Sequence, residues 1–395
     1  MKYISYIFKE SKQCFASYYT LIVLFTLWLY RIDFIPADDG GLAKGLQVFT
    51  LLGMLLFLYK KKNNIYSYSI KISNAPIKSL ILLYFYGMIS TLWALIPTFS
   101  FFLAFQNLVI IFLFIYLFDI NKSFKEKEKL FVIGAVLLIL FEIITERIVN
   151  STQIFIHFLS GGSTAALLFS YCIAELLNMR IKDKERRMYL KGSVIVSLIV
   201  LITSTSSGAN ASAVFGLIVA LFFSRHNIYA ILISLLSIFL YLNQGLIEDI
   251  LLFIMPGKTM ETIESGTGRE SIWNEIYVLA AQKPWFGWGF ACIERAVSNF
   301  GQIVSDAHNN FIGFYGSLGI VGLSIYVFHC INTFIFIFKR KHIIGFSGLF
   351  AAFCCVTLNG YSYGYLSGKT CSITIVYIAT IVLAYSYSKC KIYSK

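Results

Sequence analysis

The chain has 395 residues, of which 58% are hydrophobic, 17% aromatic and only 13% charged. This charged share is about half of that in a soluble globular domain. With a mean hydropathy of +0.74, the composition excludes a soluble enzyme and predicts a polytopic integral membrane protein. The formal net charge of +13 therefore does not indicate nucleic-acid binding, because Lys and Arg in such proteins collect in cytoplasmic loops.

Apolar runs that approach the length of a membrane span recur along the whole chain. A transmembrane helix needs about 20 mainly apolar residues, and the ends of the shorter runs can shift by several residues in either direction. The twelve expected spans are Ser17–Tyr30, Gly45–Tyr59, Ser79–Leu95, Thr98–Phe118, Leu130–Thr145, Ile154–Leu177, Gly192–Thr203, Ala211–Phe223, Ile228–Leu242, Asn309–Phe338, Ile343–Leu358 and Cys371–Tyr387. The sequence thus predicts an all-α, polytopic transmembrane helical bundle of about 12 spans.

The distribution of basic residues predicts how the bundle lies in the membrane. With the N-terminus in the cytoplasm, 25 of the 33 Lys and Arg residues fall on the inner side and 8 on the outer side. Because cytoplasmic loops carry the excess of Lys and Arg, both termini are expected to be cytoplasmic.

One long hydrophilic stretch divides the chain into three predicted parts: spans 1–9 in residues 1–242, a large outer loop in residues 243–308, and spans 10–12 in residues 309–395. The loop is net acidic, and a connection of this length is more often functional than a simple linker. Thr267 and Glu270 form a capping-box pattern ahead of a helical apolar repeat that Pro284 ends. The loop is therefore expected to contain short helices.

Three strings follow one another in and after this loop. They are Gly266-Thr267-Gly268-Arg269-Glu270-Ser271-Ile272-Trp273, then Lys283-Pro284-Trp285-Phe286-Gly287-Trp288-Gly289, then His308-Asn309-Asn310-Phe311 with glycines at 316, 319 and 322. The ordered set resembles the C-terminal signature of the O-antigen ligase and polymerase superfamily. Members are bacterial inner-membrane glycosyltransferases that act on polyprenyl-pyrophosphate-linked sugars at the periplasmic face.

This resemblance implies a periplasmic active site in the inner membrane and an undecaprenyl-pyrophosphate-linked oligosaccharide as the substrate. It also implies an inverting transfer without a metal or other cofactor. A flippase and a chain-length regulator of the same pathway are then expected partners, beside the lipid bilayer, and no nucleic acid is expected.

Two residues carry the expected catalysis. Arg269 lies in the first turn of the expected loop helix, where a guanidinium and free backbone N–H groups together favour a pyrophosphate. His308 lies at the outer mouth of the tenth span, directly after Asp306 and Ala307, and an imidazole can accept a hydroxyl proton at neutral pH. The alternatives are a solvated surface arginine and a histidine that merely starts a helix.

Four further residues are expected to bind substrate: Asn309, Trp273, Arg147 and Arg295. Asn309 would form hydrogen bonds either to the sugar or to the loop that holds His308. Members of the family often have an Arg after a Ser between the seventh and eighth spans, but the stretch Ser204–Asn210 contains none. Either hydroxyl and backbone donors replace it, or another basic residue such as Arg147 or Arg295 supplies the second positive charge. Since this Arg is characteristic of ligases, its absence favours a polymerase.

Missing motifs and the layout of the chain separate the remaining alternatives. The sequence contains no phosphate-binding P-loop, no H-E-x-x-H and no D-x-D, and its eight Cys form no C-x-x-C pair. We therefore expect an O-antigen or surface-polysaccharide polymerase, with an O-antigen ligase that transfers glycan to lipid A-core as the alternative. A polysaccharide transporter or flippase is the second alternative, but its two halves would be related, whereas here the dominant loop is off-centre.

Overall fold

The computed structural model describes residues 40–60, 76–120, 123–149, 159–178, 183–204, 206–224, 227–242, 269–299 and 306–389. The expected first span and residues 243–268 of the large loop, including Thr267, lie outside these ranges. The two domain boundaries, at 242 and at 308, therefore stay predictions.

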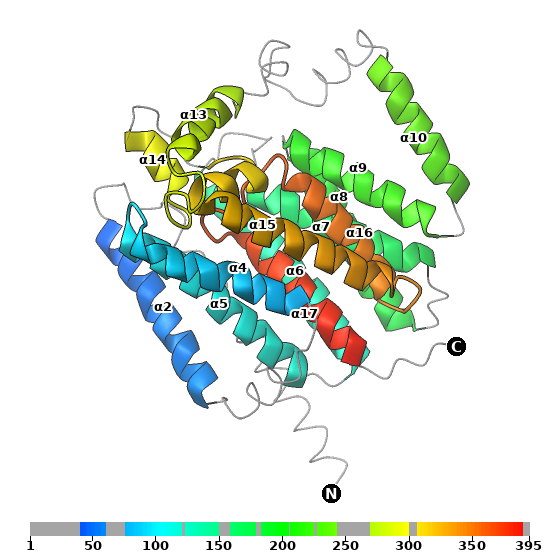
Figure 1. Ribbon diagram of the computed structural model, residues 1–395. Helices are drawn as coiled ribbons and strands as arrows, with labels where there is room; N and C mark the ends of the chain where they lie inside the picture. The colour runs from blue at the N-terminus through cyan, green and yellow to red at the C-terminus, as the bar shows by residue number, and fades with distance from the viewer. Residues whose placement is uncertain are drawn as a thin grey trace, which may run out of the picture.

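All regular structure in the described residues is helical, which confirms the all-α class (Figure 1). The helices are α2 (Gly40–Lys60), α4 (Pro76–Ile89), the 3-10 helix η2 (Ser90–Leu92), α5 (Pro97–Ile120), α6 (Phe124–Val149), α7 (Leu159–Asn178), α8 (Lys184–Thr203), α9 (Ser207–Phe222), α10 (Asn227–Leu242), α13 (Arg269–Gln282), α14 (Ile293–Asn299), α15 (Asn310–Phe338), α16 (Phe346–Asn359) and α17 (Ser372–Lys389). α13 confirms a short helix in the loop, ending just before Pro284.

Three of the described helices are long and apolar enough to cross a membrane. They comprise Pro97–Asp119, Ser160–Leu177 and Asn310–Phe338, while several other apolar helices are shorter than 18 residues. α8 turns the apolar side chains of Ile195, Ile199 and Ile202 outward, at the spacing of one helix face. An apolar outer face is suited to lipid, so these features support a membrane protein, while the number of spans stays a prediction.

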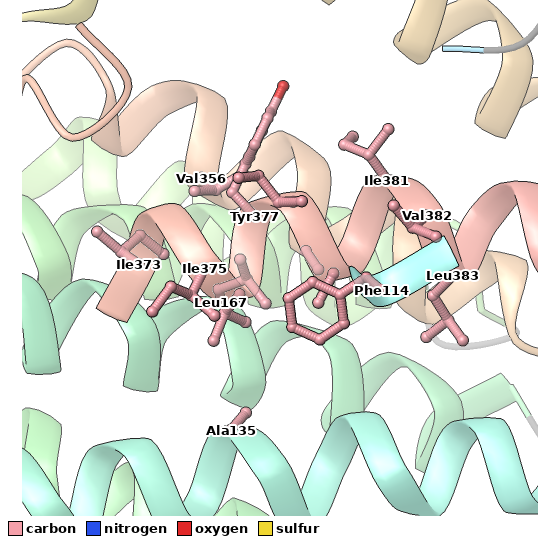
Figure 2. Close-up of a cluster of buried hydrophobic side chains, with 14 of the residues drawn as sticks. Phe114, Ala135, Leu167, Val356, Ile373, Ile375, Tyr377, Ile381, Val382 and Leu383 are labelled. Carbon is pink, nitrogen blue, oxygen red and sulfur yellow. The ribbon is translucent and has the colours of Figure 1, made fainter. Parts of the chain in front are cut away.

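The core forms around α17, which contacts α4, α5, α6, α7 and α16. Figure 2 shows Phe114 of α5, Ala135 of α6, Leu167 of α7 and Val356 of α16 gathered around Ile375 of α17. All five side chains are buried. α10 lies at the edge of the bundle beside α9, and α13 and α14 lie together at one end of α15 (Figure 1).

Buried ion pairs join α6, α7 and α8 at one end of the bundle. Arg186 donates to Glu128 through Nε at 2.6 Å and to Glu175 through Nη2 at 2.7 Å. Glu175 also accepts from the Ser347 hydroxyl at 2.7 Å and from the Gly348 N–H at 2.8 Å, at the start of α16. Because every buried charge here has partners, the cluster fixes the order of the helices at this end.

The opposite end of the bundle is built around a break in α15. Gly319 has a φ of 66°, which interrupts the helix and which few residues other than glycine adopt. Residues 284–289 dock against this break, because the N–H of Gly289 donates to the Ser317 carbonyl at 2.7 Å and the N–H of Ile320 donates to the Pro284 carbonyl at 2.8 Å. The break therefore anchors the segment between α13 and α14 on a bundle helix.

Candidate functional site

The segment from Asp306 to Asn309 enters α15 with an unusual backbone. His308 has a φ of 52°, in the left-handed region that non-glycine residues seldom adopt. Asp306 Oδ1 accepts the backbone N–H of His308 at 3.2 Å, and Asn309 Oδ1 accepts the N–H groups of Phe311 at 2.8 Å and Ile312 at 3.2 Å. Left-handed backbone held in this way is found preferentially at functional sites.

The expected contact of Asn309 with substrate stays a prediction, and the structure shows what its side-chain carbonyl binds within the fold. It is the N-cap of α15, it is 2% exposed, and its side-chain carbonyl is occupied by the helix start. An Asn directly before an apolar run is a capping signal in the sequence as well. Asn309 therefore holds the position of His308 relative to α15.

Trp273 on α13 also supports the segment from Asp306 to Asn309. Its indole Nε1 donates to the carbonyl of Ala307 at 3.0 Å. Ala307 is buried in a small second core that includes Ile276 of α13 and Ile293 of α14. The loop helices are thereby packed against the residue that precedes His308.

Arg269, Asp306 and His308 lie within electrostatic range of one another. Burial lowers the pKa of His308, Asp306 raises it, and Arg269 lowers it further. Burial also lowers the pKa of the half-buried Arg269, and the charge of Asp306 opposes this. The two residues expected to be catalytic are 39 positions apart in the sequence and lie in one site. The charge of Asp306 acts on both of them and raises the pKa of each.

A second buried carboxyl group, that of Glu294, lies close enough to Asp306 to be affected by its charge. Burial and, to a smaller extent, the charge of Asp306 raise the pKa of Glu294 on α14 to about 7, while the N–H of Ala307 donates to this side chain. Asp306 is itself held by the N–H of Gly364, and burial raises its pKa. Two close carboxyl groups in a buried place share protons, because two negative charges there repel each other.

The connection between α16 and α17 closes the site from a distant part of the sequence. The N–H of Asn310 donates to the Gly360 carbonyl and the N–H of Leu366 donates to Asn310 Oδ1, both at 2.8 Å. The same connection contacts the stretch in which the expected Arg is missing, since a Cβ on Gly208 would collide with Ser362. That stretch therefore lies at the same end of the bundle as His308.

The two candidate sources of a second positive charge are placed differently. Arg295 is exposed on α14, and its guanidinium carbon lies 5.4 Å from the ring centroid of Phe99 at the start of α5. Arg147 belongs to α6, but its side chain lies outside the described residues. No group of three or more His, Cys, Asp or Glu side chains suited to a metal occurs in the part of the chain that the structure describes.

In the sequence, Asp306 stands out only as a neighbour of His308, and neither Glu294 nor Gly364 stands out at all. Glu294 lies in a seven-residue helix with no distinctive motif, and Gly364 is 58 positions from Asp306. The sequence contains no signal that brings these residues together.

Residues 153–327 match a family model described as O-antigen ligase. The matched region contains Arg269, Glu294, Asp306 and His308 and ends within α15. No curated protein matches the chain.

Proposed function

Because the O-antigen ligase domain at residues 153–327 supports membership of the O-antigen ligase and polymerase superfamily, we propose that the chain is an inner-membrane glycosyltransferase that polymerises an undecaprenyl-pyrophosphate-linked oligosaccharide. The observation that carries this proposal is the shared site of Arg269 and His308 around Asp306. A guanidinium and an imidazole supply the two tasks of this reaction, which are to neutralise a diphosphate leaving group and to accept a proton.

The reaction is a single displacement at the anomeric carbon of the donor sugar. The acceptor hydroxyl gives its proton to His308 while its oxygen forms a bond to that carbon. The bond from the carbon to the pyrophosphate oxygen breaks, and the lipid diphosphate leaves with the electron pair, paired with Arg269. The sugar therefore inverts its configuration, and His308 later returns the proton to solvent.

The positions of charged residues support a periplasmic site. The end with Asp306 and His308 is opposite to the end with the Arg186 cluster, where Lys125, Lys129 and Lys339–Lys341 also lie. Basic residues collect on the cytoplasmic side of membrane proteins, so the His308 end faces the periplasm.

The experiment is a gel of surface polysaccharide from the source bacterium with the gene deleted and complemented. A polymerase leaves lipid A-core with a single repeat unit, and Arg269→Ala and His308→Ala do not restore the ladder of long chains. Arg187→Ala and His342→Ala, which change exposed residues at the other end, restore it. Restoration of the ladder by both site variants would refute the site.

A ligase is the second candidate, because the matching family model is described as an O-antigen ligase. The same gel separates the two, since a strain without its ligase shows bare core and accumulates lipid-linked polymer. The lack of an Arg in Ser204–Asn210 is the observation that favours the polymerase.

A further inference from the structure

Asp306 contacts His308 at two points. Oδ1 accepts the backbone N–H at 3.2 Å, and Oδ2 lies 3.7 Å from the imidazole Nδ1. Both Oδ2 and Nδ1 are buried atoms without a hydrogen-bond partner among the described residues. A small movement of either side chain, of the kind that occurs when substrate binds, would bring them into a hydrogen bond.

The surroundings of Asp306 favour its charged form over that of Glu294. Asp306 receives the Gly364 N–H and lies in the field of Arg269 and His308. Glu294 is 6% exposed, and its Oε1 has no partner in the described part of the chain. Its charged form is favoured by two backbone N–H groups, its own and that of Ala307, and by the exposed Arg295, but by no adjacent charge like that of His308. One proton on the pair is therefore best placed on Glu294.

We propose that Asp306 is the positioning residue of His308, holding the imidazole through Nδ1–H so that Nε2 faces the acceptor hydroxyl, while Glu294 keeps the proton of the carboxyl pair. The assignment of Nε2 as the base rests on the proposed function. The proton of the acceptor hydroxyl moves to Nε2, and the imidazolium that forms is stabilised by the carboxylate of Asp306. Asp306 itself stays ionised and touches no substrate.

The charged and titratable groups around Asp306 and His308 come from four separate parts of the described fold. Tyr363, in the α16–α17 connection, is within range of both Asp306 and Glu142 of α6. Among the described residues these groups are Arg269 on α13, Glu294 and Arg295 on α14, Tyr363 and, through Tyr363, Cys371 and Glu142. None of these groups raises the pKa of His308, whereas Asp306 directly opposes the lowering of that pKa by burial and by Arg269.

The test measures the pKa of His308 in the full-length purified chain from the rate of hydrogen exchange at the histidine C2 position, resolved by mass spectrometry. In Asp306→Asn, which keeps an acceptor for the backbone N–H, we expect the pKa of His308 to fall by about one unit or more. Asp306→Glu keeps the charge and should leave the pKa near that of the original chain. Glu270→Gln removes an exposed charge from the same end of α13 as Arg269 and serves as the control.

Glycan transfer supplies the second readout. Asp306→Asn should lower kcat at least about tenfold with little change in KM, and the acid limb of the pH profile should move to lower pH. An unchanged pKa of His308 in folded Asp306→Asn would overturn the pairing, as would an unchanged kcat. If the pKa falls as expected but the original chain transfers no glycan, the pairing stands and the proposed function is refuted.

Discussion

Substitution of Glu294 by Gln should make the chain more stable at neutral and alkaline pH. The burial of Glu294 raises its pKa from the ordinary 4.5 to about 7 in the folded protein. The folded state therefore binds a proton more tightly than the unfolded state. The stability that comes from this proton is fully present below about pH 4.5 and is lost as the pH rises through about 7.

The size of the effect follows from this difference in pKa. Each unit corresponds to about 1.4 kcal/mol, so Glu294 costs the folded protein up to about 3 kcal/mol above pH 7. A neutral Gln keeps the oxygen that accepts the Ala307 N–H and removes this cost. The gain in stability of Glu294→Gln should grow between pH 4.5 and about 7 and then stay level.

The assay is thermal unfolding of the purified chain in detergent from pH 5 to pH 8.5. The unfolding temperature of Glu294→Gln should exceed that of the original chain by an increasing amount as the pH rises. Glu270→Gln, at an exposed position, should unfold at the same temperature as the original chain at each pH. Parallel curves for Glu294→Gln and the original chain would show that Glu294 is charged in the folded state and would refute the reasoning.

Two further substitutions test the packing around the site and at the opposite end. Trp273→Phe should lower the free energy of unfolding by about 1–3 kcal/mol and shorten the glycan ladder, because the buried carbonyl of Ala307 loses its donor. Unfolding curves measure the first effect and the gel the second. An unchanged ladder would contradict the supporting role of Trp273. Arg186→Leu should lower the free energy of unfolding by about 3–5 kcal/mol, because Glu128 and Glu175 stay buried without their counter-charge. A normal amount of folded protein in the membrane at 37 °C would contradict this.

The helices could be predicted from the sequence because long apolar runs in a membrane must satisfy their backbone hydrogen bonds internally, which an α-helix does. The helix after Arg269 was also predictable, since a regular apolar repeat precedes Pro284. The break at Gly319 was not, because its cause is the docking of residues 284–289 from another part of the chain.

The candidate site divides in the same way. Arg269 and His308 were singled out from the sequence by their chemistry and by the order of the motifs, and their catalytic roles stay predictions. Trp273 and Asn309 were predicted to bind substrate, and the contacts that the structure shows for them are the Ala307 carbonyl and the start of α15. The type of side chain shows that each residue can form a hydrogen bond, but its partner depends on which residues lie next to it in the fold.

The most direct test of the central claim uses purified protein with a polyprenyl-pyrophosphate-linked oligosaccharide as both donor and acceptor. We expect the original chain to form longer lipid-linked glycan and to release one polyprenyl pyrophosphate for each bond formed. Arg269→Ala and His308→Ala should each lower this rate by at least about a hundredfold while remaining folded. Equal rates of product formation by the original chain and by folded His308→Ala would contradict it.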